Sequence, residues 1–132
     1  MQFNKLLVVD DSDTTRIMIR TYLKGLGFRI VEEADNGDTA VKAVEGALKN
    51  KAPYDLIFVD VNMPKVNGIQ FVEYIKKTLG DSRPHMIMIT GEAEKESVLR
   101  GLRAGVDAYL LKPVSPASLK AAIDKLLAKT TA

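Results

Sequence analysis

Residues 56–64 read Leu-Ile-Phe-Val-Asp-Val-Asn-Met-Pro, and this stretch decides how the chain folds. The four consecutive apolar residues that begin it predict a strand buried on both faces, as in a parallel sheet covered by helices. The run ends on Asp60, and Pro64, Asn67 and Gly68 in the following loop keep the strand from continuing. Open α/β sheets collect ligands and chemistry at the carboxyl ends of their strands, so Asp60 is the first candidate functional residue.

The same pattern, an apolar run that ends on a polar residue, recurs along the chain. Runs with strand character cover residues 5–10, 30–34, 55–60, 85–90 and 108–111, the last followed by Lys112. Between and after them, helical periodicity predicts amphipathic helices over about 14–26, 40–48, 69–79, 98–105 and 116–127. Ser12 or Asp13 is expected to cap the first of these helices, Asn67 the third and Ser115 the last, and residues 35–37 are expected to form a turn. Five strands that alternate with five helices predict an α/β fold, a doubly wound parallel sheet with right-handed crossovers.

Composition excludes several classes of protein. The 132 residues suit a single domain, expected to span 1–132 without an output domain. There is no cysteine and only one histidine, His85, so disulfides, thiolate metal sites and histidine metal clusters are excluded. A net charge of +2 does not favour nucleic-acid binding. No apolar run approaches membrane-spanning length and no signal peptide is visible, so we expect a cytoplasmic protein without a membrane partner.

The residues that end the predicted strands form a chemical set: Asp10 with Asp11, Asp60, Thr90 and Lys112. In a doubly wound sheet these strand ends meet at one edge. Three carboxylates repel each other unless a cation lies between them, and oxygen ligands suit Mg²⁺, with Mn²⁺ as an alternative. With Lys112 and Thr90 able to bind phosphoryl oxygens, the set predicts phosphoryl transfer to the Asp60 carboxylate.

The motifs at these strand ends resemble those of a known family. They read VVDDS at 8–12, DVNMPKVNG at 60–68, MITGEA at 88–93 and AYLLKP at 108–113. Over residues 5–127 the chain is similar to the receiver domain of two-component response regulators, most of all to the free-standing chemotaxis (CheY-like) type. The resemblance implies a flavodoxin-like fold with five parallel strands in the order 2-1-3-4-5.

The resemblance also implies roles for individual residues. Asp60 would accept the phosphoryl group from a phosphohistidine on a sensor histidine kinase. Mg²⁺ would be held by Asp10, Asp11, Asp60 and the backbone carbonyl of Asn62. Lys112–Pro113 would be a cis peptide bond. Thr90 and Tyr109 would act as a coupled switch, altering the surface formed by the fourth helix, fifth strand and fifth helix.

Three further positions concern the phosphoryl group itself. Asn62 and Glu92 lie two residues after Asp60 and Thr90 and would flank the path of attacking water, which predicts a lifetime of seconds to a few minutes. Gly91 would leave the rim open and allow phosphorylation by small donors such as acetyl phosphate. We expect a monomer that catalyses only its own phosphorylation and dephosphorylation and is otherwise not an enzyme.

Two other classes of protein fit these residues less well. A phosphatase with a D-x-D motif would need a second acid, where this chain has Asn62. A flavin-binding module would need a phosphate-binding loop after the first strand, where the stretch Asp10-Asp11-Ser12-Asp13 would instead repel a phosphate. A phosphorelay intermediate and a degenerate, constitutive interaction module stay open. The downstream partner is equally open: a flagellar motor protein, another enzyme or a histidine phosphotransfer protein.

Overall fold

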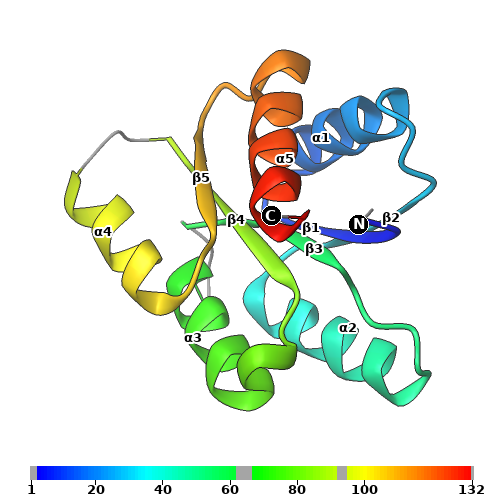
Figure 1. Cartoon of the computed structure of the whole chain (residues 1–132), viewed down its shortest axis with the longest axis vertical. Helices are drawn as coiled ribbons and strands as arrows, with labels where there is room; N and C mark the ends of the chain where they lie inside the picture. Colours follow the sequence, from blue (N-terminus) through cyan, green and yellow to red (C-terminus); the bar gives the residue numbers. More distant parts are fainter. Residues whose placement is uncertain (1–2, 62–66, 92–94, 132) are drawn as a thin grey trace.

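A five-stranded parallel sheet forms the centre of the protein, with helices on both of its faces (Figure 1). The structure, a computed structural model, describes residues 3–61, 67–91 and 95–131. In chain order the elements are β1 (Lys5–Val9), α1 (Asp13–Gly25), β2 (Ile30–Ala34), α2 (Gly37–Lys49), β3 (Leu56–Asp60), α3 (Gly68–Leu79), the 3₁₀ helix η1 (Gly80–Ser82), β4 (His85–Thr90), α4 (Lys95–Ala104), β5 (Ala108–Leu111) and α5 (Pro116–Thr131).

The strand order is β2-β1-β3-β4-β5 with every pair parallel, so the predicted fold class and order are confirmed. In the register of the sheet, Val9 of β1 lies opposite Val59 of β3. The next residues, Asp10 and Asp60, therefore leave the sheet at the same level. This register brings the functional candidates together.

The apolar runs of β1, β3 and β4 are continuous because each of these strands packs on two layers of helices. Successive side chains of a strand point to opposite faces. Thus Ile57 and Val59 of β3 belong to the core beneath α2 and α3, whereas Leu56 and Phe58 belong to the core beneath α1 and α5. In Figure 1, α1 and α5 lie on one side of the sheet and α2 and α3 on the other.

The helices begin at side-chain caps. Ser12 caps α1 by accepting a hydrogen bond from the Thr15 backbone N–H, which settles the choice between Ser12 and Asp13. Asn67 caps α3 as predicted, in a capping box with Gln70. Residues 35–37, predicted as a turn, behave differently: Asn36 is the N-cap of α2 and its helix begins at Gly37.

Helix α4 exposes apolar residues that helical periodicity assigned to its apolar face. Leu99 and Leu102 of α4 are 41% and 45% exposed, and over residues 99–104, where burial is described, the buried positions are instead Gly101 and Ala104. A Cβ atom on Gly101 would overlap the sulfur of Met88 in β4, so a side chain at this position would require the end of the Met88 side chain to move. The sequence pattern alone did not show that the helix turns its smallest residues inward.

His85, the single histidine, lies at the start of β4. Its ring contacts the edge of Phe3, with the ring centroids 5.6 Å apart, and its Nδ1 lies 3.6 Å from a carboxylate oxygen of Asp107. That partner was not visible in sequence because it lies 22 residues away. Across the described part of the chain, none of the helices has both the length and the apolarity needed to cross a lipid bilayer.

Candidate functional site

Three carboxylates meet at the carboxyl edge of the sheet. Asp10 follows β1 and Asp60 ends β3, and both side chains are buried; Asp11 is exposed beside them. One oxygen from each of the three carboxylates lies within 4.8 Å of the other two. The structure therefore places at one point the acids that the sequence assigned to separate strand ends.

Lys112 supplies the positive charge between the two buried acids. Its Nζ lies 3.4 Å from Oδ1 of Asp60 and 3.5 Å from Oδ2 of Asp10. The Lys112 backbone N–H donates to the carbonyl of Thr90, which ties the β5 end to the β4 end. The Lys112–Pro113 peptide bond is cis, as the resemblance implied.

The oxygens of Asp10 show how the cluster suits a hard cation. Its Oδ1 accepts the Ser12 backbone N–H at 2.8 Å. Its Oδ2 is buried and has no hydrogen-bond donor among the residues that the structure describes, although Lys112 faces it at ion-pair distance. A buried carboxylate oxygen in that situation, next to two more carboxylates, fits a divalent ion such as Mg²⁺.

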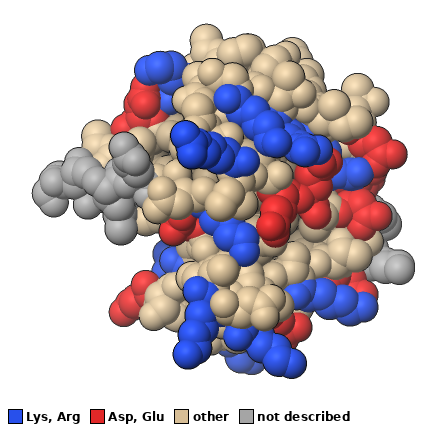
Figure 2. Space-filling model, turned by 90° about the vertical axis from the view of Figure 1, so that its right-hand side faces the viewer, with Lys and Arg blue, Asp and Glu red and all other residues tan. Residues whose placement is uncertain are grey.

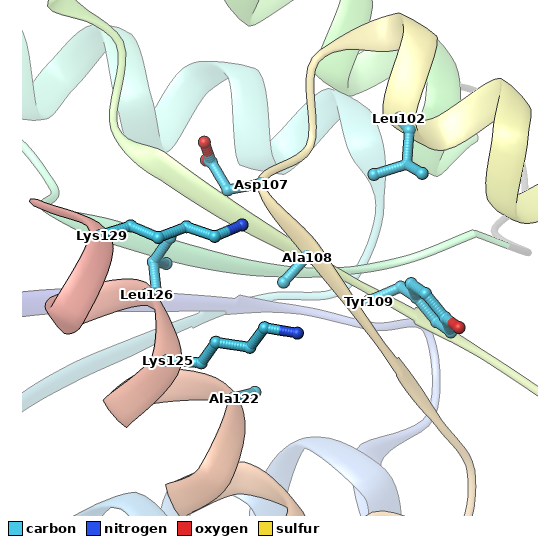
Figure 3. Close-up of a pocket in the computed structure, with 8 residues that line it drawn as sticks. All are labelled: Leu102, Asp107, Ala108, Tyr109, Ala122, Lys125, Leu126 and Lys129. Carbon is cyan, nitrogen blue, oxygen red and sulfur yellow. The ribbon is translucent and has the colours of Figure 1, made fainter.

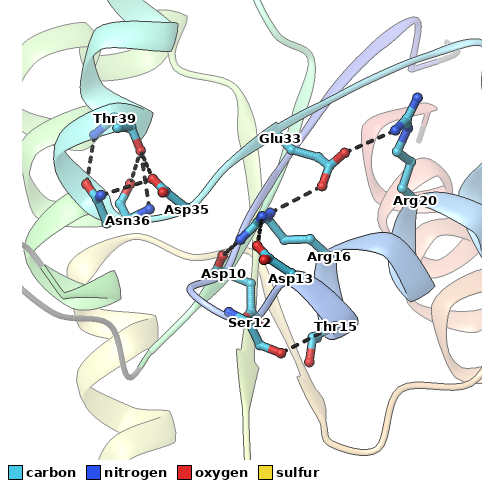
Figure 4. Close-up of polar contacts among 10 residues, drawn as sticks. All are labelled: Asp10, Ser12, Asp13, Thr15, Arg16, Arg20, Glu33, Asp35, Asn36 and Thr39. Carbon is cyan, nitrogen blue, oxygen red and sulfur yellow. Dashed lines mark hydrogen bonds and ion pairs between the residues drawn. The ribbon is translucent and has the colours of Figure 1, made fainter.

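Arg16 of α1 holds the loop that carries Asp10 and Asp11. Its guanidinium donates to the carbonyl oxygen of Asp10 at 2.7 Å and pairs with Glu33 at 3.2 Å and with Asp13 (Figure 4). Burial acts to lower the pKa of Arg16, but the hydrogen bonds to Asp13 and Glu33 outweigh it and the pKa is raised. Sequence reasoning missed this residue, because a buried arginine on a helix looks like a surface one.

Gly68 brings the first turn of α3 against the end of β3. Its N–H donates to the carbonyl of Val61 at 3.0 Å. A Cβ atom at position 68 would lie 2.9 Å from the carbonyl carbon of Asp60 and would overlap its carbonyl oxygen. The sequence indicated Gly68 only as part of a strand-breaking loop, so this close approach to the Asp60 backbone is new.

The predicted switch residues lie on neighbouring strands. Thr90 is buried at the end of β4, one residue after Ile89, which pairs in register with Asp60, and Tyr109 of β5 pairs in register with Met88. The Tyr109 side chain is 44% exposed and lines a pocket between β5 and α5, together with Leu102, Asp107, Ala108, Ala122, Lys125, Leu126 and Lys129 (Figure 3).

The residues expected to tune the phosphoryl group divide into two groups. Gly91 is exposed, and a Cβ atom there would meet no atom within 4 Å among the described residues, which fits an open rim. Asn62 and Glu92 lie outside the described residues, so the metal-binding carbonyl and the two lifetime positions stay predictions.

On the face in Figure 2, basic and acidic side chains are interspersed.

Comparison with known proteins gives a consistent result. The protein-family model described as the response regulator receiver domain matches residues 6–124 of this chain. Chemotaxis protein CheY-3 of Vibrio cholerae is 35% identical over 122 residues, which cover 92% of this chain and 90% of that protein. Chemotaxis protein CheY1 of Helicobacter pylori is 37% identical over 123 residues, which cover 93% of this chain and 96% of that protein.

Solved structures of similar proteins have the same fold. The structure of Vibrio cholerae chemotaxis protein CheY4 matches with a TM-score of 0.80 and 31% identity, covering 94% of this chain and 98% of that chain. A chain of the CheX–CheY–BeF3–Mg²⁺ complex from Borrelia burgdorferi matches with a TM-score of 0.84 and 26% identity, covering 94% of this chain and 89% of its own.

Proposed function

This chain belongs to the response regulator receiver domain family, and on that premise we propose that it is a phosphoacceptor signalling protein of a two-component system. In this proposal Asp60 takes a phosphoryl group from the phosphohistidine of a sensor kinase. The supporting observation is the position of the Lys112 Nζ, within 3.5 Å of both buried carboxylates. Such an ammonium can neutralise a phosphoryl oxygen as it arrives beside Asp60.

The proposed transfer exchanges one bond for another. An oxygen of the Asp60 carboxylate attacks phosphorus, the bond from phosphorus to the imidazole nitrogen breaks, and the imidazole keeps the electron pair. The product on this chain is an acyl phosphate. Lys112 pairs with one phosphoryl oxygen and the Thr90 hydroxyl donates to another. Water reverses the modification by attacking phosphorus, which releases inorganic phosphate and restores the carboxylate.

We further propose Mg²⁺ as the resident ion, with Mn²⁺ as an alternative. Asp10, Asp11 and Asp60 would hold it, together with the Asn62 carbonyl that the resemblance implies. When bound, the ion offsets the repulsion between these carboxylates and the incoming phosphoryl oxygens. Support comes from the three carboxylate oxygens that cluster in this site, and from the similar Borrelia burgdorferi structure, a CheX–CheY complex with BeF3 and Mg²⁺.

Downstream, the proposal assigns partner binding to the face formed by α4, β5 and α5. Thr90 would move toward the phosphoryl group, and the Tyr109 ring, now 44% exposed, would fill the space it leaves. Relatives named as chemotaxis proteins make a target in chemotaxis the favoured partner class. Replacing Tyr109 with Ala should leave phosphorylation unchanged and weaken capture of a target by the beryllofluoride-activated protein.

Phosphorylation with acetyl phosphate tests the proposed chemistry directly. We expect intact-mass spectrometry to show one added phosphoryl group in Mg²⁺ and none in EDTA, with a base-labile bond. Asp60→Asn should remove the modification, whereas Asp81→Asn, at an exposed acid of η1, should keep it. Unmodified wild-type protein in Mg²⁺ would contradict the proposal and favour a constitutive interaction module. Persistence for hours would contradict only the predicted short lifetime.

A further inference from the structure

One guanidinium makes three contacts at the edge of the proposed metal site. Arg16 donates to the backbone carbonyl of Asp10, pairs with Glu33 at the end of β2, and pairs with Asp13 in the first turn of α1. Its side chain is only 12% exposed. Figure 4 shows the guanidinium in the space between the β1–α1 loop and β2. A planar fork can serve three acceptors at once in this way, whereas a lysine ammonium has no such fixed geometry.

The contact with the Asp10 carbonyl bears on both acids of the loop. That carbonyl belongs to the planar peptide unit that joins Asp10 to Asp11. On the other side, the Asp10 N–H donates to the Ala34 carbonyl at 3.1 Å. With both backbone groups bonded, the direction in which Asp11 leaves the strand is set. Asp11 itself is exposed, so packing does not hold its carboxylate near the other two.

We infer that Arg16 is a positioning residue for the divalent cation, which keeps the Asp10–Asp11 peptide in the orientation that directs both carboxylates to one ion. The inference rests on the proposed function, because it takes the acidic cluster to be the Mg²⁺ site. Groups that orient metal ligands without touching the metal commonly change its affinity by about 10–100-fold when they are replaced.

Charge and positioning predict opposite results when Arg16 is replaced by Met. A positive charge close to the cluster repels Mg²⁺, so losing that charge alone would tighten Mg²⁺ binding. Losing the hydrogen bond to the Asp10 carbonyl would free the peptide unit and loosen binding. Arg20 offers a matched control, because it pairs with the same Glu33 at 3.1 Å from a half-exposed position and its one described ion pair is with that carboxylate.

The test is calorimetric titration of the unphosphorylated full chain with Mg²⁺, well below its melting temperature. We expect the Kd of Arg16→Met to rise about tenfold or more. Arg16→Lys, which keeps the charge without the fork, should also bind more weakly than wild type, and Arg20→Met should stay within twofold. Because affinity is measured on folded protein, a general loss of stability would not produce this pattern.

Each outcome has a distinct meaning. Unchanged or tighter binding by Arg16→Met would overturn the inference, as would wild-type affinity in Arg16→Lys or an equal loss in Arg20→Met. If Arg16→Met does not fold, Arg16→Lys and Arg20→Met still give the comparison. Failure of the wild-type protein to bind Mg²⁺ would instead overturn the proposed metal site, with Asp10→Asn as the variant expected to lose binding.

Discussion

Replacing Gly68 with Ala tests the closest backbone approach at the site. The added methyl would lie 2.9 Å from the Asp60 carbonyl carbon and from the Cα of Val61, and both are backbone atoms that cannot rotate away. Forcing extra atoms into a packed site costs about 1–3 kcal/mol, and losing the bond from the Gly68 N–H to Val61 would add about 1 kcal/mol. We therefore expect the free energy of unfolding to fall by about 2–4 kcal/mol.

The size of the chain converts that loss into a measurable change. For a domain of this length, about 3–4 °C of melting temperature is lost per kcal/mol, so the variant should melt roughly 6–16 °C lower. The backbone that must move carries Asp60, and a misplacement of about 1 Å can slow chemistry on the order of 100-fold. Phosphorylation by acetyl phosphate should therefore be slower even at temperatures where the variant is fully folded.

Gly46→Ala is the matched control, since it makes the same substitution within α2. A Cβ atom there would meet nothing within 4 Å among the described residues. Alanine should stabilise the helix interior by about 0.5–1 kcal/mol, which is the opposite sign. Urea unfolding followed by circular dichroism measures both variants. A Gly68→Ala protein within 0.5 kcal/mol of wild type would refute the close approach of α3 to β3.

Three other substitutions have expected outcomes with a definite sign. Asp60→Asn should raise the free energy of unfolding by about 1 kcal/mol in EDTA, because it removes a buried charge that repels two neighbouring carboxylates. Mg²⁺ should then stabilise only the wild-type protein. A lower melting temperature of the variant in EDTA would contradict this prediction. Lys112→Met should slow phosphorylation by about 100-fold or more, measured by intact mass, and should tighten Mg²⁺ binding, measured by calorimetry. An unchanged rate of phosphorylation would contradict the proposal that Lys112 neutralises a phosphoryl oxygen. Burial and a hydrogen bond to Glu32 raise the pKa of Tyr54 above its usual 10.0. The stability that this hydrogen bond contributes is therefore complete below about pH 10 and is lost as the pH rises further. Tyr54→Phe should flatten this alkaline decline, which is measured as the denaturant midpoint at each pH.

Sequence patterns predicted the architecture closely because strands buried on both faces leave a strong signal. β4 and β5 begin and end where the apolar runs predicted, and β3 begins one residue later than expected, at Leu56. The caps were equally readable, since Asn67 and Ser115 are residue types that satisfy free helix N–H groups locally. α4 was less predictable, because its exposed leucines obey helical spacing just as buried ones would.

The sequence by itself determined which chemical groups lie at the strand ends. Asp10 and Asp11 follow β1, Asp60 ends β3, Thr90 ends β4 and Lys112 follows β5. These assignments depend only on local hydrophobic periodicity and its breaks. Tertiary structure alone decided the contacts between groups distant in sequence. The register of β1 with β3 sets the spacing between the Asp10 and Asp60 carboxylates. The Arg16 guanidinium links α1 to Glu33 of β2, and Gly68 allows α3 to approach the Asp60 backbone closely. Such contacts arise from packing in three dimensions, and no spacing along the chain encodes them.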